Sequence, residues 1–118
     1  MDELAKQHCE PCRIGAPTVT REEIETLKPQ VPQWTIRNVG GINRLERTFT
    51  FDDYAQALAF TLRVGELAEQ EGHHPVTLTE WGRVTVSWWT HKIRGLHAND
   101  FVMAAKTDRI LAGTAKSG

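Results

Sequence analysis

A long amphipathic segment, residues 53–72, constrains the fold of this chain more than any other feature of the sequence. Asp52 or Asp53 can cap a helix start, and Gly72 is a suitable C-terminal stop. Apolar residues between them recur at helical spacing on one broad face, namely Ala55, Ala57, Leu58, Phe60, Leu62, Val64, Leu67 and Ala68. Such a helix must bury that face against a second layer, which the rest of the chain has to supply.

The segments on either side of this helix alternate apolar and polar residues with period two. Residues 34–51 contain a Gly40-Gly41 pair that suits a tight turn, and residues 76–88 turn at Trp81-Gly82. Their β-branched and aromatic content favours strands. Each segment therefore predicts a β-hairpin.

Shorter helical patterns lie near both ends of the chain. Thr20 and Glu23 form a capping box that predicts a helix over residues 21–28, and apolar spacing predicts a last helix over about residues 98–111. The resulting order is α-β-β-α-β-β-α. We expect an α+β two-layer sandwich, in which one four-stranded antiparallel sheet is covered on one face by helices.

The domain organisation follows from length and composition. A chain of 118 residues with 40% hydrophobic residues can bury one core, so we expect a single domain over residues 20–118. Residues 1–19 are polar and broken by proline and glycine, which predicts a flexible N-terminal extension. Cys9 and Cys12 in this extension have the spacing of half a zinc site or of a redox pair. Reduced thiols are the favoured interpretation, and metal binding stays open.

Charge and hydropathy restrict the partners. Fourteen basic and fifteen acidic residues give a net charge of −1, which argues against direct binding to nucleic acid or to an anionic membrane. No apolar run is long enough to span a membrane, and residues 1–15 lack the pattern of a secretory signal. We therefore expect a cytoplasmic protein.

One face of the expected sheet has no helix to cover it. Trp81, Trp88 and Trp89 all fall in the second hairpin, and this is more aromatic surface than a small sheet usually exposes. We therefore predict a homo-oligomer, leaving dimer or tetramer open.

Three of the five histidines and two carboxylates gather at the end of the central helix and at the end of the second hairpin. His73 and His74 follow the helix stop, and Glu69 lies one turn earlier, where its carboxylate could orient a ring. The hairpin would bring His91 toward His74, while Asp100 falls in the first turn of the last helix. Imidazoles that titrate near neutral pH suit proton transfer, so this pattern indicates an acid/base site.

Other kinds of site fit this pattern less well. The adjacent residues His73 and His74 cannot easily share one metal ion, and no marked nucleophile or glycine-rich phosphate loop occurs. The ordinary role of Asp100 would be to stabilise the helix start. Trp89, facing away from Trp88, could line a site for a flat heterocycle.

The spacing Glu69-x3-His73-His74-Pro75-x5-Trp81-x9-His91-x8-Asp100 resembles the signature of pterin-4a-carbinolamine dehydratases. The resemblance extends over residues 20–112. Residues 1–19 resemble the leader of bacterial members that accompany phenylalanine hydroxylase.

This resemblance implies a hydro-lyase that dehydrates 4a-hydroxytetrahydrobiopterin to quinonoid dihydropterin without a metal or organic cofactor. It implies that His73, His74 and His91 are catalytic, with His73 our first choice for proton transfer and the division into acid and base left open. The implied pterin site also includes Pro75, Thr90, Lys92 and Ile93, with Glu69, Asp100 and Trp89 as supports. The residues after Pro75 are Val76, Thr77 and Leu78, with no aromatic residue where animal members carry one, so the preferred pterin side chain is open.

A regulatory role is the alternative from another class. Relatives of this family also act as dimerisation cofactors or regulators of hydroxylase expression, which would make the chain a protein-binding module. Exposure of Phe101, Val102 or Met103 on the last helix would favour this alternative.

Overall fold

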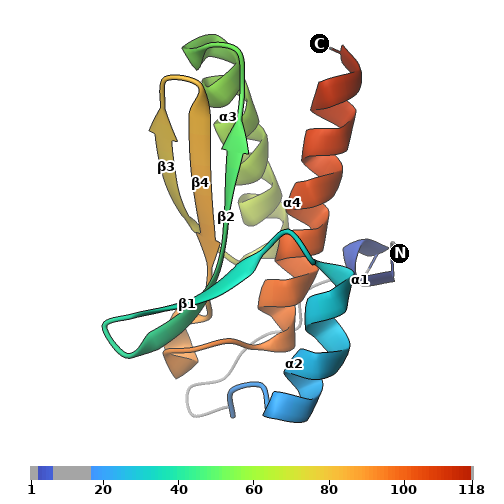
Figure 1. The fold of residues 1–118 in the computed structure, drawn as a ribbon, viewed down its shortest axis with the longest axis vertical. Helices are drawn as coiled ribbons and strands as arrows, with labels where there is room; N and C mark the ends of the chain where they lie inside the picture. The colour runs from blue at the N-terminus through green and yellow to red at the C-terminus, as the bar shows by residue number, and fades with distance from the viewer. Residues whose placement is uncertain (1–2, 7–16, 118) are drawn as a thin grey trace.

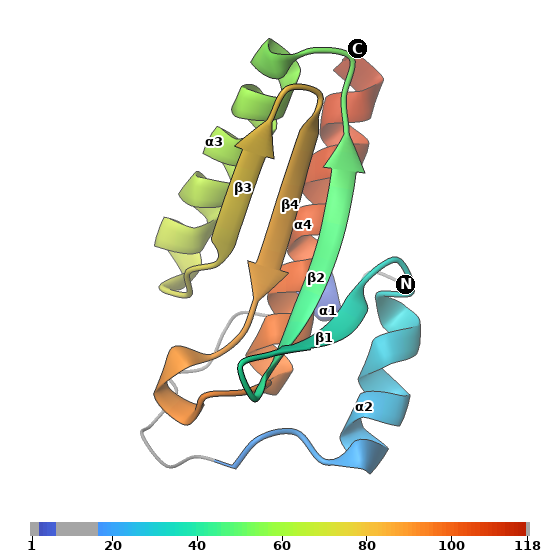
Figure 2. The same ribbon diagram turned by 60° about the vertical axis from the view of Figure 1, so that its left-hand side comes forward.

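The computed structural model describes residues 3–6 and 17–117, with the side chains of residues 112–117 excepted. Its centre is one antiparallel sheet in the order β1-β2-β4-β3 (Figure 1). The strands are β1 (Thr35–Val39), β2 (Ile42–Thr50), β3 (Val76–Glu80) and β4 (Arg83–Trp88). Figure 2 shows the two long helices on one side of this sheet and the other side uncovered. The predicted α+β sandwich is confirmed.

The predicted order of elements is also observed, with three short additions. The helices that were expected are α2 (Arg21–Leu27), α3 (Tyr54–Glu71) and α4 (Ala98–Ser117). The additions are α1 (Glu3–Lys6) and the 3-10 turns η1 (Lys28–Gln30) and η2 (His91–Ile93). Among the residues that the structure describes, no helix is both long and apolar enough to cross a membrane.

Strand register decides which side chains face the helices. Leu45 pairs with Trp88 and Phe49 pairs with Val84, and all four side chains are buried. Directly opposed residues point to the same face of a sheet, so this alternation places the core between β2, β4 and the long helices.

The ends of α3 follow the sequence prediction. Asp53 accepts a hydrogen bond from the backbone N–H of Gln56 at 2.8 Å, and Gly72 adopts the left-handed conformation with a φ of 66°. The buried face of α3 is narrower than predicted, because it consists of Ala57, Phe60, Val64 and Ala68. Successive residues are about 100° apart around a helix. Leu58 directly follows the buried Ala57, so the row that contains Leu58 and Leu62 faces away from the core and is exposed.

The beginning of the chain contacts the domain. Leu4 and Ala5 are buried, and the Lys106 ammonium donates to the carbonyl of Ala5 at 2.8 Å. Further along, the N–H of Val19 donates to the carbonyl of Leu96 at 2.8 Å. The rest of the predicted extension, residues 1–2 and 7–16 with both cysteines, lies outside the described residues.

The tryptophans of the second hairpin do not form one aromatic surface. Trp88 is fully buried, and Trp89 lies under the guanidinium of Arg44, 4.0 Å from its ring centroid. Only Trp81, at the hairpin tip, is largely exposed, at 72%. Alternation sends Trp88 and Trp89 to opposite faces, so the three tryptophans do not supply the exposed aromatic surface from which a homo-oligomer was predicted.

Candidate active site

His73 is fixed by contacts on two sides of its ring. It follows the left-handed Gly72, and its backbone N–H donates to the carbonyl of Ala68 at 3.2 Å. Its Nε2 lies 2.6 Å from Oδ1 of Asp100, and the ring stacks on Trp88 with centroids 5.7 Å apart and planes 8° apart. The side chain of His73 is 13% exposed, so it is largely but not completely enclosed.

Asp100 joins three segments that are far apart in the sequence. Its side chain is 0% exposed. Oδ1 meets His73, while Oδ2 accepts the Thr90 hydroxyl at 2.9 Å and the backbone N–H of His97 at 2.9 Å. The expected stabilisation of the helix start is present in the His97 contact. The same carboxylate also orients a histidine at the end of α3, because an ionised carboxylate can only accept and His73 must then donate.

His74 makes the same kind of contact in solvent. Its Nε2 lies 2.5 Å from Oε2 of Glu69, and the two side chains are 57% and 78% exposed. The position of Glu69 one turn before the helix end accounts for the contact. The predicted role of Glu69 in orienting a ring therefore has a matching geometry, although the ring is that of His74.

His91 lies on η2 and packs against the end of β4 on the side opposite to His73. Its ring centroid is 4.5 Å from that of Trp89, which Arg44 covers. Among the described residues, no hydrogen bond or ring contact joins His91 to the other two histidines of the sequence pattern. Because His73 packs on Trp88 and His91 packs on Trp89, the two histidines flank the end of β4.

The loop that carries His91 is closed at its base. The backbone N–H of Thr90 donates to the carbonyl of Gly95 at 2.8 Å, and the reverse bond is 3.4 Å. Arg94 adopts a left-handed φ of 52° inside the loop. A Cβ at Gly95 would lie 2.7 Å from Cγ2 of Thr18, so the segment before α2 packs tightly on this base. Backbone pairing and packing together define the place of His91.

The remaining residues expected in the pterin site lie close to these in the chain. Pro75 is partly buried between His74 and β3, Lys92 is exposed on η2, and Ile93 is partly buried. Among the described residues, no group of three or more His, Cys, Asp or Glu side chains is arranged to hold a metal ion.

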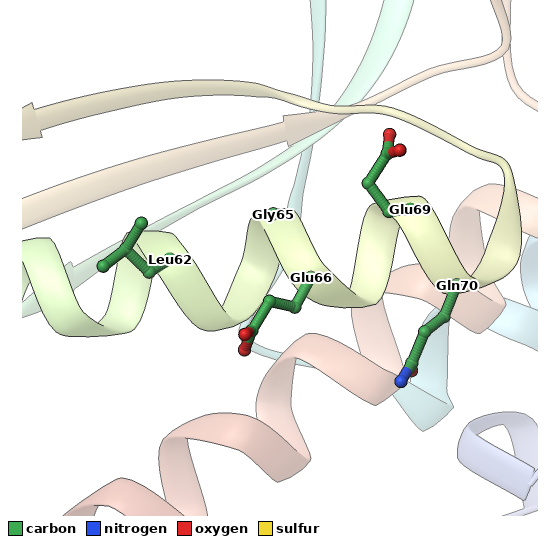
Figure 3. A pocket seen from close by; sticks show the side chains of 5 residues that line it. All are labelled: Leu62, Gly65, Glu66, Glu69 and Gln70. Carbon is green, nitrogen blue, oxygen red and sulfur yellow. The ribbon is translucent and has the colours of Figure 1, made fainter.

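An open depression of about 640 Å³ runs along the outside of α3. Figure 3 shows Glu69 projecting toward the segment that leads into β3, whereas Glu66 and Gln70 project the other way. Leu62 and Gly65 complete its lining. The depression therefore borders the His74 pair and lies apart from the buried contact of His73.

Sequence reasoning missed two contributions. His97 contacts Asp100 through its backbone, and Arg44 covers Trp89. The position of His97, three residues before an acidic residue at a helix start, was an available signal. Arg44 had no comparable signal, because its contact depends on the pairing of β2 with β4.

Comparison with known proteins now adds a family. The family model for "Pterin 4 alpha carbinolamine dehydratase" matches residues 17–110. The chain belongs to this family. A protein of Syntrophotalea carbinolica named "Putative pterin-4-alpha-carbinolamine dehydratase" is 58% identical over 111 residues, which cover 94% of this chain and 99% of the relative. One of Gloeobacter violaceus with a similar name is 61% identical over 109 residues, covering 92% and 94%.

Two solved structures have a similar fold. A Brucella melitensis protein described as a transcriptional coactivator/pterin dehydratase aligns with a TM-score of 0.70 and 29% identity, over 80% of this chain and 98% of that one. A pterin dehydratase-like protein described as a RuBisCO assembly factor in the alpha-carboxysome aligns with a TM-score of 0.54 and 26% identity, over 64% and 88%.

Proposed function

We propose that this chain dehydrates 4a-hydroxytetrahydrobiopterin to quinonoid dihydropterin, in the cytoplasmic recycling of tetrahydrobiopterin for phenylalanine hydroxylase. The observation that carries the proposal is the contact of 2.6 Å between His73 and the buried Asp100. It holds one imidazole in a defined orientation at the edge of the domain. Membership of the dehydratase family and the names of the relatives support the choice of reaction.

The reaction needs one proton delivered and one removed. The C4a–O bond breaks as the hydroxyl group takes a proton and leaves as water. N5 loses its proton, and its electrons form the C4a=N5 double bond. A group that delivers the first proton and a group that accepts the second are sufficient, and the atoms balance without an oxidant or reductant.

His73 and His74 have suitable nitrogens for these transfers. Each ring directs Nε2 toward a carboxylate, and neither Nδ1 makes a hydrogen bond to the described residues. In our proposal, His73 transfers a proton at the 4a-hydroxyl or at N5 through Nδ1. Asp100 and Glu69 hold the two rings in orientation.

In our proposal the pterin ring binds beyond the end of β4, where side chains from both sides of the strand can reach it. His73, His74 and Pro75 approach it from one side, and the loop from Thr90 to Ile93 approaches it from the other. His91 and Trp89 offer aromatic surface for a flat bicyclic ring. Backbone groups of the loop would pair with the amide-like edge of the pterin.

The test is stopped-flow decay of 4a-hydroxytetrahydropterin generated by phenylalanine hydroxylase. We expect the wild type to accelerate the decay, and His73→Ala to reduce that acceleration by about 10²-fold or more. Arg21→Ala, an exposed change on α2, is the control for handling and concentration. If His73→Ala and His91→Ala both kept wild-type rates, the assignment of the site would be wrong.

We also propose that the protein is a homo-oligomer, either a dimer or a tetramer. This part of the proposal is based on α3 and no longer on the tryptophans. Three apolar side chains four residues apart on α3 are exposed, namely Tyr54 (46%), Leu58 (42%) and Leu62 (62%). A row of this kind suits a helix–helix contact between copies. Light scattering of the wild type and of Leu62→Glu tests it, with a decrease in mass expected for the variant.

A regulatory protein-binding role is the second candidate. The side chains that would have favoured it on α4, namely Phe101, Val102 and Met103, are buried. The exposed row on α3 is one surface available for it, and the coactivator and assembly-factor names of the structural relatives support it. A Leu62→Glu variant that keeps full turnover but loses a protein partner would separate this role from catalysis.

A further inference from the structure

His97 lies immediately before α4, where the first backbone N–H groups have no partner within the helix. Its Nδ1 accepts a hydrogen bond from the backbone N–H of Asn99 at 3.0 Å. Serine, threonine, aspartate and asparagine are the usual residues at such a position, where a side-chain oxygen is the acceptor. In this chain an imidazole nitrogen caps the helix instead.

This contact determines which nitrogen of His97 carries a proton. The backbone N–H of Asn99 can only donate, so Nδ1 must accept and cannot carry a proton itself. The capping ring is therefore neutral with its proton on Nε2. A doubly protonated ring would direct an N–H of Nδ1 at the N–H of Asn99, and the cap would be lost.

Asp100, in the first turn of α4, binds back to the backbone of His97. Its Oδ2 accepts the backbone N–H of His97 at 2.9 Å, and its own backbone N–H donates to the His97 carbonyl at 2.9 Å. The bond from the His97 N–H to Oδ2 and the bond from the Asn99 N–H to Nδ1 together resemble a capping box, with histidine in place of serine or threonine and with the N–H of Asn99, rather than that of Asp100, bonded to the cap side chain. The carboxylate that completes this box is the same one whose Oδ1 lies 2.6 Å from His73.

Burial makes this arrangement sensitive to small displacements. Asp100 is fully buried, so water cannot easily replace a partner that moves away. Oδ2 is shared by the His97 N–H and the Thr90 hydroxyl, and both fix the plane of the carboxylate. A displacement of the α4 start therefore affects the position of His73 through two hydrogen bonds, one from the His97 N–H to Asp100 and one between Asp100 and His73.

We propose that His97 is a positioning residue of the active site. In its neutral form it caps α4 and so holds Asp100 in the place where it orients His73. The effect on turnover rests on the proposed function, in which His73 transfers a proton. The placement of Asp100 and His73 does not depend on turnover and can be tested separately.

The first test needs only the wild type. Nitrogen-15 NMR of the imidazole groups distinguishes a protonated nitrogen from an unprotonated one. We expect His97 to carry its proton on Nε2 with Nδ1 unprotonated, and His73 to show an Nε2 proton that is shared with Asp100. A His97 ring with its proton on Nδ1 in the folded protein at neutral pH would overturn the proposal.

The second test compares two replacements with a matched control. His97→Ala removes the cap, whereas His97→Ser supplies the usual capping hydroxyl. Thr20→Ala removes the corresponding cap of α2, where the Thr20 hydroxyl accepts from the backbone N–H of Glu23 at 3.1 Å. This control loses a cap of the same kind without any contact to Asp100.

We expect His97→Ala to lower kcat by roughly three- to thirtyfold. This is the change in rate that results if the whole free energy of an ordinary N-cap serves to align Asp100 with His73. KM should change little, the His73 Nε2 proton signal should broaden, and His97→Ser should restore both kcat and the signal. Thr20→Ala should alter neither. Equal kcat and equal His73 signals in His97→Ala and Thr20→Ala would overturn the proposal, as would failure of His97→Ser to restore the signal.

The two proposals fail in different ways. If the wild type did not turn over the pterin, the proposed function would be wrong, but the NMR comparison of the folded variants would still decide the role of His97. If turnover is present and the His73 signal does not respond to His97, only the positioning role is wrong.

Discussion

His73 and His74 are neighbours in the chain and make the same kind of contact in opposite surroundings. Both direct Nε2 at a carboxylate oxygen, at 2.6 Å for Asp100 and 2.5 Å for Glu69. The first pair is almost completely enclosed and shares its carboxylate with two further donors, while the second is mostly in solvent. Similar distances therefore correspond to very different energies, since exposed pairs contribute little to stability and loss of one partner of a buried pair is costly.

The largest expected effect is the difference in stability between variants that lack one or the other carboxylate. Asp100→Ala leaves buried donors of His73, Thr90 and His97 without a partner, so we expect a loss of about 3–5 kcal/mol in the free energy of unfolding. Glu69→Ala should cost about 1 kcal/mol or less. Urea unfolding of both variants measures the difference, and equal losses would contradict the comparison.

A second prediction concerns the loop base that supports the buried pair. Gly95→Ala places a methyl group 2.7 Å from Cγ2 of Thr18, and overpacking of this kind costs about 1–3 kcal/mol. Because Thr90 pairs with Gly95 and donates to Asp100, turnover should fall as well. Adding Thr18→Ala removes the obstructing methyl group and should recover much of the stability. A double-mutant cycle without coupling would contradict this packing.

Salt should separate the two pairs further. Screening weakens attraction between exposed charges much more than attraction between buried ones. Replacing Glu69 by Gln should therefore change stability by less than about 1 kcal/mol at low salt and by almost nothing in 1 M NaCl. Unfolding of wild type and variant at the two salt concentrations measures this. A cost of Glu69→Gln that persists in high salt would mean that the exposed pair is held as firmly as the buried one.

Two other carboxylates, Asp108 and Glu46, are both partly buried and have opposite pH dependence because their partners differ. Burial raises the pKa of Asp108 above its ordinary value of 3.8, and the hydrogen bond from Trp34 and the charge of Arg47 only partly oppose it. Burial also acts to raise the pKa of Glu46, but hydrogen bonds from Arg37 and Ser87, with the charges of Arg37 and Arg44, hold it below 4.5.

These two pKa shifts predict the smallest effects, which are changes of stability with pH. The contribution of Asp108 is fully present below pH 3.8 and is lost as pH rises through its raised pKa, so Asp108→Asn should gain relative to wild type on going from acid to neutral pH. The contribution of Glu46 is present above pH 4.5 and is lost as pH falls through its lowered pKa, so Glu46→Gln should be most costly near neutrality. Each effect should be about 1 kcal/mol or less. Urea unfolding from pH 3 to pH 7 measures both, and parallel curves for the two variants would contradict them.

Local patterns were sufficient to predict the elements of this fold. Caps, turn glycines and the period of the apolar residues act over a few positions, so α3 with Asp53 and Gly72 could be predicted from the sequence. The exposed row through Leu58 could not be separated from the buried row, because both have helical spacing and only tertiary packing selects one of them.

The candidate site shows the same limit at longer range. The His74 contact with Glu69 joins residues five apart, across the end of α3, and was within reach of the sequence. The partner of His73 lies 27 residues away on another element, and its enclosure depends on how α4 meets β4. Arg44 over Trp89 depends on strand pairing, which no short motif records.

The parallel stack of His73 on Trp88 gives the protein an optical probe of its candidate active site. An excited indole can transfer an electron to a nearby imidazolium, so the emission of Trp88 should weaken when His73 gains a proton and recover when it loses one. Trp34 is buried elsewhere, Trp81 is in water at the hairpin tip, and Trp89 lies beneath Arg44. Variants that retain Trp88 while the others are replaced by phenylalanine would make proton occupancy of a single ring visible in a fluorimeter, without a label or a bound ligand.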